Sequence, residues 1–189
     1  MNWDKYKEDV HITVEALKTE EISDFVNLMK DAYANERSVF IIGNGGSASA
    51  ASHLCNDLCI GTLWSKDSNK KRMRAISLTD NISIMTAWAN DTKYDHIFDQ
   101  QLRNLAASKD ILVAISGSGN SINVLNAIDY ANERGMHTVS ITGFDGGKLK
   151  KTSKSNIHVP IDDMGMVEAI HGVIFHYIAS KLREDLKID

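Results

Sequence analysis

The sequence predicts an α/β fold, a three-layer α-β-α sandwich in which helices cover both faces of a parallel β-sheet. Short apolar segments alternate with longer segments whose apolar residues recur at helical spacing, and this alternation is typical of parallel sheets. The segment 110–115 is apolar at nearly every position, as expected for a strand buried on both faces. No linker, repeat or low-complexity tract interrupts the pattern. We therefore expect a single domain over 1–189, with an N-terminal helix over 1–34 and an α/β core over 35–189.

Each predicted element has its own local pattern. Apolar residues at helical spacing predict helices over 1–34, 48–58, 94–107, 124–134 and 164–186, with another around 84–88 that is broken at 90–91. Short apolar runs predict strands over 38–42, 74–78, 110–115, 138–142 and 157–159. The polar segment 63–72 is expected to be a loop, and Gly135 ends the helix over 124–134. The strands and helices therefore alternate from residue 38 onward.

Composition excludes several classes of protein. The 189 residues carry a formal net charge of −4, which argues against nucleic-acid binding. No apolar run is long enough to cross a bilayer, and residues 1–10 lack the apolar core of a signal peptide. We therefore expect a cytoplasmic protein without membrane contact. Cys55 and Cys59 lie four residues apart in a predicted helix, and we expect two plain buried thiols rather than a disulfide.

Two loops rich in glycine and serine carry the clearest chemical signal. Each follows a predicted strand and opens a helix; they are Gly43-Asn44-Gly45-Gly46-Ser47 and Ser116-Gly117-Ser118-Gly119-Asn120-Ser121. Unpaired N–H groups and a positive dipole at a helix N-terminus attract anions, so both loops fit a phosphate or sugar hydroxyls. Neither contains Lys or Arg, which favours a monophosphate ester over a triphosphate. Their spacing matches neither a dinucleotide fingerprint nor a P-loop. The alternative is two tight turns that bind nothing.

A second group of residues combines histidines with acids. His53 and Asp57 lie four apart on one helix, and Glu168 and His176 lie eight apart on another. Two histidines and two carboxylates could form a zinc site. Spacing alone is weak support, because such pairs are common on protein surfaces. His171 lies on a partly apolar helix, and we interpret it as structural.

The two loops resemble the signature loops of SIS (sugar isomerase) domains. The stretches 88–91 and 142–149 resemble the phosphoheptose isomerase subgroup in particular. This resemblance implies a flavodoxin-like sheet and a sugar phosphate held by the loop serines. The implied substrate-binding residues are Asn44, Gly45, Gly46, Ser47, Asn90, Asp91, Ser116, Ser118, Asn120, Ser121 and Glu168.

The resemblance also implies an activity and an assembly. Phosphoheptose isomerases convert sedoheptulose 7-phosphate to D-glycero-D-manno-heptose 7-phosphate, which supplies heptose for surface polysaccharide. The implied catalytic residues are Asp57, which would move the proton, and His176, which would act as an acid or in ring opening. A zinc ion in each subunit would be bound by His53, Asp57, Glu168 and His176. Homotetramers with sites at subunit junctions are expected.

This chain departs from the family pattern at five positions. Asp57 replaces a Glu, Glu168 replaces a Gln, and Gly61 and Met166 stand where the family often has Arg. Gly117 stands where the family often has Thr, so one hydroxyl donor is missing. Lys66, Lys70, Lys71, Arg72 or Arg74 could supply the missing positive charge. Two alternatives therefore stay open. One is an isomerase of another sugar phosphate; the other is a non-catalytic SIS protein that binds a sugar phosphate or a protein such as a replication initiator.

Overall fold

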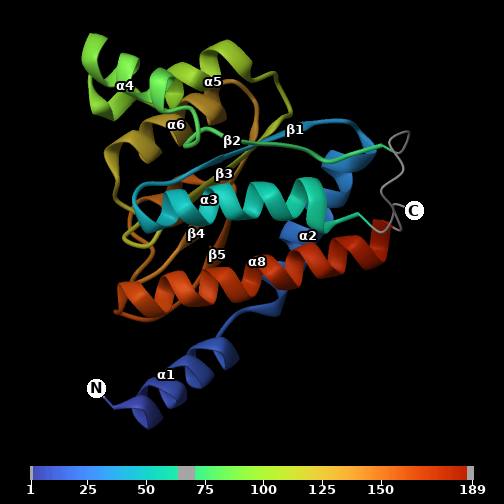
Figure 1. Cartoon of the computed structure of the whole chain (residues 1–189), viewed down its shortest axis with the longest axis vertical. Coiled ribbons are helices and arrows are strands. Elements are labelled where there is room, and N and C mark those ends of the chain that lie inside the picture. The colour runs from blue at the N-terminus through green and yellow to red at the C-terminus, as the bar shows by residue number, and fades with distance from the viewer. Residues whose placement is uncertain (1, 64–70, 187–189) are drawn as a thin grey trace.

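Five parallel strands form the centre of the fold. The computed structural model describes residues 2–63 and 71–186. The strands are β1 (Ser38–Ile42), β2 (Arg74–Ser77), β3 (Ile111–Ser116), β4 (His137–Thr142) and β5 (Ser155–His158). They are ordered β2-β1-β3-β4-β5, and all four neighbouring pairs are parallel. The predicted parallel sheet is thus confirmed, and Figure 1 shows it between layers of helices.

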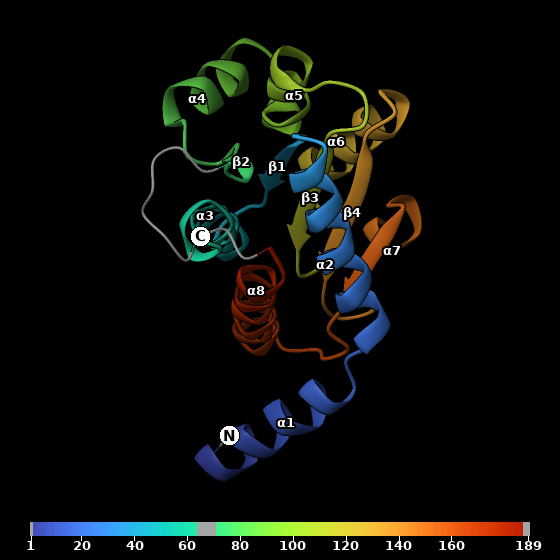
Figure 2. The ribbon, with the colours of Figure 1, turned by 90° about the vertical axis from the view of Figure 1, so that its right-hand side faces the viewer.

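The helices follow the strands along the chain. They are α1 (Trp3–Glu15), α2 (Thr19–Ala34), α3 (Gly46–Asn56), α4 (Ile82–Asp91), α5 (Asp99–Leu105), α6 (Ile122–Glu133), α7 (Leu149–Thr152) and α8 (Met164–Leu186). A π turn, η1 (Asp57–Gly61), continues α3, and a 3-10 turn, η2 (Tyr94–His96), precedes α5. Figure 2 shows that α1 extends away from the rest of the molecule. Among the described residues, no helix combines the length and apolar character needed to span a bilayer.

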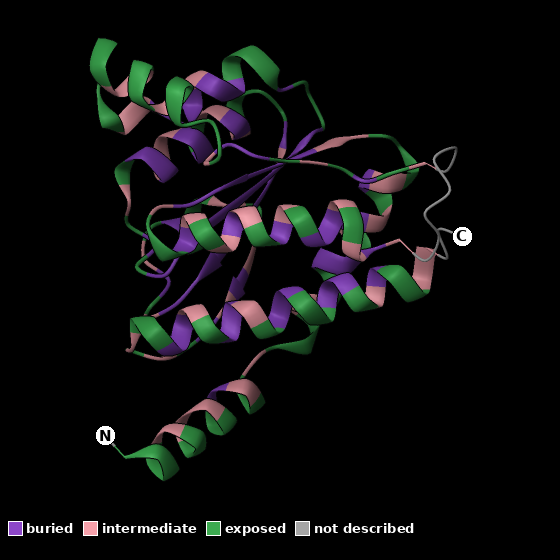
Figure 3. Ribbon diagram, viewed as in Figure 1, coloured by how far each residue is buried: buried purple, intermediate pink, exposed green. Residues whose placement is uncertain are grey.

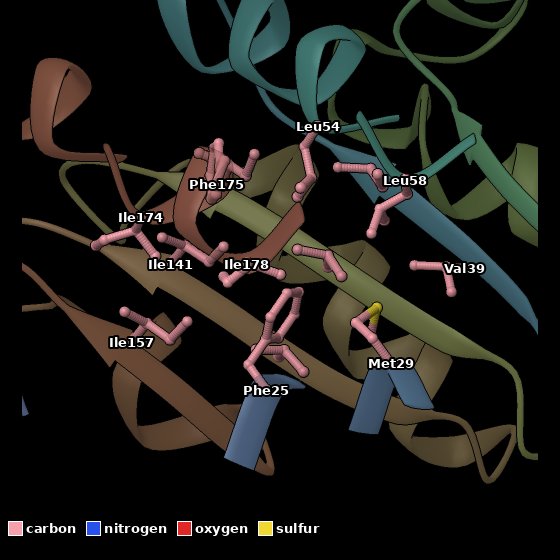
Figure 4. Close-up of a cluster of buried hydrophobic side chains, with 14 of the residues drawn as sticks. Phe25, Met29, Val39, Leu54, Leu58, Ile141, Ile157, Ile174, Phe175 and Ile178 are labelled. Atoms are coloured by element: carbon pink, nitrogen blue, oxygen red, sulfur yellow. The ribbon is translucent and has the colours of Figure 1, made fainter. Parts of the chain in front are cut away.

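Side chains that alternate along the strands build two separate hydrophobic cores. Val39 and Ile41 of β1 face a core that also contains residues of α2, α3 and α8, shown in Figure 4. Phe40 and Ile42 face the opposite core, which is closed by α5 and α6. Successive side chains of a strand point to opposite faces, so this division confirms a sheet covered on both sides. In Figure 3 the central strands β1, β3 and β4 are mostly buried, whereas α1 is mostly exposed.

Several predicted boundaries were wrong. The helix predicted over 1–34 is two helices, because residues 16–18 leave the helical path. At this break Lys18 has an extended backbone, and Leu17 packs against the core. The segment 94–107 likewise contains a 3-10 turn and a shorter α-helix rather than one helix. The last strand ends at His158 instead of residue 159.

The strand order determines where a ligand can bind. From β1 the chain passes to β2 on one side, and it then crosses to β3 on the other side of β1. The loops that follow β1 and β3 therefore diverge at the carboxyl edge of the sheet. In open parallel sheets the crevice at such a switch point is the usual ligand site. Both loops rich in glycine and serine lie at this point.

Candidate active site

The loop after β1 is held in place by side chains from elsewhere in the chain. The Asn44 and Asn123 amides exchange two hydrogen bonds, at 2.8 and 2.9 Å, and the Tyr94 hydroxyl donates to Asn44 Oδ1 at 3.0 Å. Gly45 adopts a φ of 55° before α3 begins, a conformation that glycine adopts without strain. Asn44 therefore positions the loop. The sequence prediction missed Asn123 and Tyr94, since no motif marks them.

The loop after β3 places three serines around a small cavity. Ser116 is buried, and its Oγ lies 3.4 Å from Ser121 Oγ. The Asn120 amide donates to Ser118 O at 2.8 Å and accepts from Lys148 N at 3.2 Å, so this side chain braces the loop. The phosphate cavity, as we call it, has a volume of about 150 Å³ and is lined by Asn44, Ser47, Ile115, Ser116, Gly117, Ser118, Ser121, Met164 and Glu168. It brings together the four serines that the sequence predicted.

The predicted acid and histidines meet next to this cavity. Asp57 Oδ1 lies 3.7 Å from His53 Nε2, and Asp57 Oδ2 lies 3.1 Å from His176 Nδ1. The two imidazole rings cross edge to face, with their centroids 4.8 Å apart. The Asp57 side chain is 12% exposed, compared with 55% for His53 and 60% for His176. A largely buried carboxylate therefore lies between two accessible imidazoles.

The local backbone explains why Asp57 points at this site. It is the first residue of the π turn that widens the end of α3, and single π turns often occur at functional sites. His53 lies four residues earlier on the same helix face, while His176 comes from α8. The three residues offer ligand atoms that all lie within 4.8 Å of one another.

This donor set fits a divalent metal ion. The buried Asp57 Oδ2 has no hydrogen bond of acceptable geometry within the described part of the chain. Two imidazole nitrogens and a carboxylate oxygen are typical zinc ligands, and three protein ligands leave a position open for substrate or water. Glu168 lies outside the group of three, although it was predicted as a fourth ligand.

Glu168 lies between the two halves of the site. It lines the phosphate cavity and also the metal cavity, as we call the cavity of about 210 Å³ that contains His53, Asp57 and His176. A Cβ atom on Gly46 would overlap the Glu168 carboxylate. Glycine at the first position of α3 therefore lets this carboxylate lie against the helix N-terminus.

Four of the predicted substrate residues line neither cavity. Asn90 and Asp91 end α4, are exposed, and hydrogen-bond to each other at 2.8 Å. Gly45 and Asn120 belong to the two loops but are also absent from both linings. Within one copy of the chain, the described residues therefore leave Asn90 and Asp91 outside the site.

The remaining sequence expectations concern buried groups. Cys55 and Cys59 are half-buried rather than fully buried, and a hydrogen bond from Cys55 lowers the pKa of the Cys59 thiol to about 6. His171 is 1% exposed, and burial lowers its pKa to about 4. The Thr142 backbone opposes this shift in the pKa of His171, and neither ring nitrogen of His171 makes a regular hydrogen bond among the described residues. His171 is thus a packing residue, as the sequence suggested.

Sequence comparison decides the family. Residues 3–143 match the SIS domain family. A phosphoheptose isomerase of Helicobacter pylori (strain P12) is 37% identical over 173 residues, covering 92% of this chain and 88% of the relative. The chain belongs to the phosphoheptose isomerase family. A probable phosphoheptose isomerase of Thermoplasma acidophilum is 34% identical over 168 residues, covering 89% of this chain and 90% of the relative.

Solved structures agree with this family assignment. The phosphoheptose isomerase of Neisseria gonorrhoeae superposes with a TM-score of 0.85 at 31% identity and covers 95% of both chains. The phosphoheptose isomerase of Francisella tularensis gives 0.86 at 26% identity, covering 96% of this chain and 94% of the other. The SIS fold expected from the two loops is therefore confirmed over nearly the whole chain.

The structure also locates the departures from the family pattern. Met166 is 1% exposed and packs inside α8's buried face. A Cβ on Gly61 would lie 3.7 Å from Asp57 Cβ. Lys71 donates to Ala34 O, and Arg74 donates to Glu36 O, so both are bound away from the cavities. Lys66 and Lys70 lie outside the described residues.

Proposed function

We propose that this protein is an aldose-ketose isomerase that converts sedoheptulose 7-phosphate to D-glycero-D-manno-heptose 7-phosphate, for surface-polysaccharide heptose. The observation that carries this proposal is the pairing of a serine-lined cavity with an acid and two histidines, with Glu168 lining both. The serine cavity suits the phosphate ester, and the acid and histidines suit proton transfer. The names of the relatives, phosphoheptose isomerases, support a heptose phosphate as the substrate.

The geometry suits proton transfer between neighbouring carbons. In the forward reaction Asp57 would take a proton from C1 of the ketose, which gives an enediol, and return it to C2. His176 would give a proton to the C2 oxygen as the enediol forms, and it would take up the proton that the C1 hydroxyl loses as the aldehyde forms. Asp57 Oδ2 lies 3.1 Å from His176 Nδ1, so the two groups can act on adjacent atoms. General acid–base catalysis of this kind contributes about 10²–10⁴-fold in rate.

We also propose one zinc ion per subunit, bound by His53, Asp57 and His176 with Glu168 close by. The cluster of three potential ligands supports it. Bound zinc would polarise the substrate carbonyl and stabilise the oxyanion. The chain's own residues would orient the sugar: the loop serines at the phosphate and Asp57 at the reacting carbons.

The assembly is proposed to be a cytoplasmic homotetramer of single-domain subunits, with sites at subunit junctions. Both histidines are more than half exposed in one copy. An apolar groove of about 290 Å³ also runs between α1, α2 and α8, lined by Val14, Leu17, Thr19, Ile22, Ser23, Val173, Ile174 and Tyr177. Light scattering at micromolar concentration should give four subunits; a monomer would contradict the shared-site proposal.

A coupled assay with a panel of phosphosugars tests the activity. Wild-type protein should turn over sedoheptulose 7-phosphate, and Asp57→Asn should reduce kcat by about 10²–10⁴-fold. Asp4→Asn, which changes an exposed carboxylate on α1, serves as the control and should retain activity. Turnover of another sugar phosphate alone would change the substrate, whereas binding without turnover of any sugar would replace the isomerase with a binding protein.

A further inference from the structure

The two cavities of the site share a carboxylate, and the described residues that line them include no Lys or Arg. Glu168 lines both cavities, and Asp57 lines the metal cavity. Two carboxylates therefore lie where a phosphorylated sugar would bind. An amide in place of Glu168 would carry no charge, so Glu168 is the source of the negative charge beside the phosphate cavity.

The position of Glu168 means that its negative charge opposes phosphate binding. Gly46 lets the carboxylate lie against the N-terminus of α3, where backbone N–H groups and the helix dipole favour an anion. The loop after β1 would bind a phosphate with the same N–H groups at the N-terminus of α3. A phosphate monoester carries a charge of about −1.5 to −2 near neutral pH. Glu168 and the phosphate would thus compete for one source of positive potential and repel each other.

A cation in the metal cavity would change this balance. Glu168 lines the same cavity as His53, Asp57 and His176, so a divalent ion bound by those three residues would be close to its carboxylate. The positive charge would offset Glu168, either by attracting its carboxylate or by screening it from the phosphate. Lys71 and Arg74 cannot take this role, because they bind backbone oxygens at Ala34 and Glu36.

We infer that cation binding and sugar-phosphate binding are coupled through Glu168, so that each ligand increases the affinity for the other. The inference rests on the proposed function, and it adds that the affinity for the sugar phosphate depends on whether the metal ion is bound. Coupling of binding is reciprocal. The metal ion would therefore act on phosphate affinity from a neighbouring cavity, in addition to any action on the reacting carbons.

Calorimetry with a substrate analogue that cannot react tests the coupling. The probe is the heptitol 7-phosphate mixture made by borohydride reduction of sedoheptulose 7-phosphate, titrated into zinc-loaded and chelator-treated protein. We expect zinc to lower the Kd of wild-type protein at least about fivefold, the lower end of typical couplings. In Glu168→Gln the zinc effect should fall below about twofold. Metal-free Glu168→Gln should also bind the probe more tightly than metal-free wild type.

The outcomes separate coupling through Glu168 from direct contact between metal and sugar. Glu20→Gln, at an exposed position of α2, is the matched control and should keep the wild-type coupling. An undiminished zinc effect in Glu168→Gln overturns the inference, as does a wild-type Kd that zinc leaves unchanged. If those results come from protein that still isomerises the sugar, the proposed function stands. No binding of the probe in any arm, together with no turnover, would overturn both.

Discussion

His171 makes the stability of this fold sensitive to acid. The unfolded chain binds a proton at a pKa of 6.5, whereas burial lowers the pKa of His171 in the folded protein to about 4. The unfolded state therefore gains more from protonation, and stability falls as pH drops from above 6.5 towards 4. The shift of about 2.5 pKa units corresponds to about 3 kcal/mol below pH 4, of which about 2 kcal/mol is already lost at pH 5.

Urea unfolding at pH 7.5 and pH 5.0, at one fixed protein concentration, measures this effect. His171→Leu should lose about 2 kcal/mol less stability between the two pH values than wild type. At pH 7.5 it should be as stable as wild type or more so, because it removes two ring nitrogens that lack regular hydrogen bonds among the described residues. His11→Ala, at an exposed position of α1, should leave the pH dependence unchanged. An equal acid loss in wild type and His171→Leu would refute the reasoning.

Three further substitutions test the loops and their supports. Ser118→Ala should weaken phosphosugar binding by about 1–3 kcal/mol, the cost of one charge-assisted hydrogen bond; unchanged affinity by calorimetry would remove Ser118 from the phosphate site. Asn123→Ala should cost about 1–3 kcal/mol of stability in urea unfolding, because it leaves the Asn44 amide without its reciprocal partner. Gly143→Ala should destabilise by about 1–3 kcal/mol, since its Cβ would lie 2.7 Å from Val167 Cγ1. Combining it with Val167→Ala should recover part of that loss in a double-mutant cycle.

The parallel sheet was predictable because its signal is local. The apolar run of β3 has all its residues buried, and the helix of α8 begins and ends at the residues that its periodicity indicated. The break between α1 and α2 was not predictable from spacing. Apolar positions continue through residues 10–29 at nearly helical intervals, whereas in the structure the backbone is extended at Lys18 and Leu17 packs against the core.

Some features of the candidate site were likewise predictable from the sequence and others were not. The two loops follow from short-range motifs, so the sequence located them. Spacing gave only weak support for grouping Asp57 with His53 and His176, and the family resemblance supplied that grouping. The roles of Asn44 and Asn120 did not follow, because hydrogen bonds to Asn123 and Lys148 occupy their side chains. Glu168 was assigned to the site by the family resemblance, with weak support from helix spacing. Its place between two cavities depends on the absence of a side chain at Gly46, which no pattern in the sequence indicates.

The outer strands of the sheet, β2 and β5, have only four residues each. Such short strands limit the pairing of one molecule's sheet edge with a strand of another molecule. An open strand edge offers unpaired backbone groups that can template the strand of another chain. At β5 one of these groups is already used, since His158 N donates to Glu21 Oε2 at 3.0 Å and Lys18 Nζ lies 3.2 Å from Glu21 Oε1. The Glu21 carboxylate, paired with Lys18 at the start of α2, thus occupies one backbone donor of the open edge of β5. The same contact that joins α2 to β5 therefore helps to keep concentrated protein from aggregating through its strands.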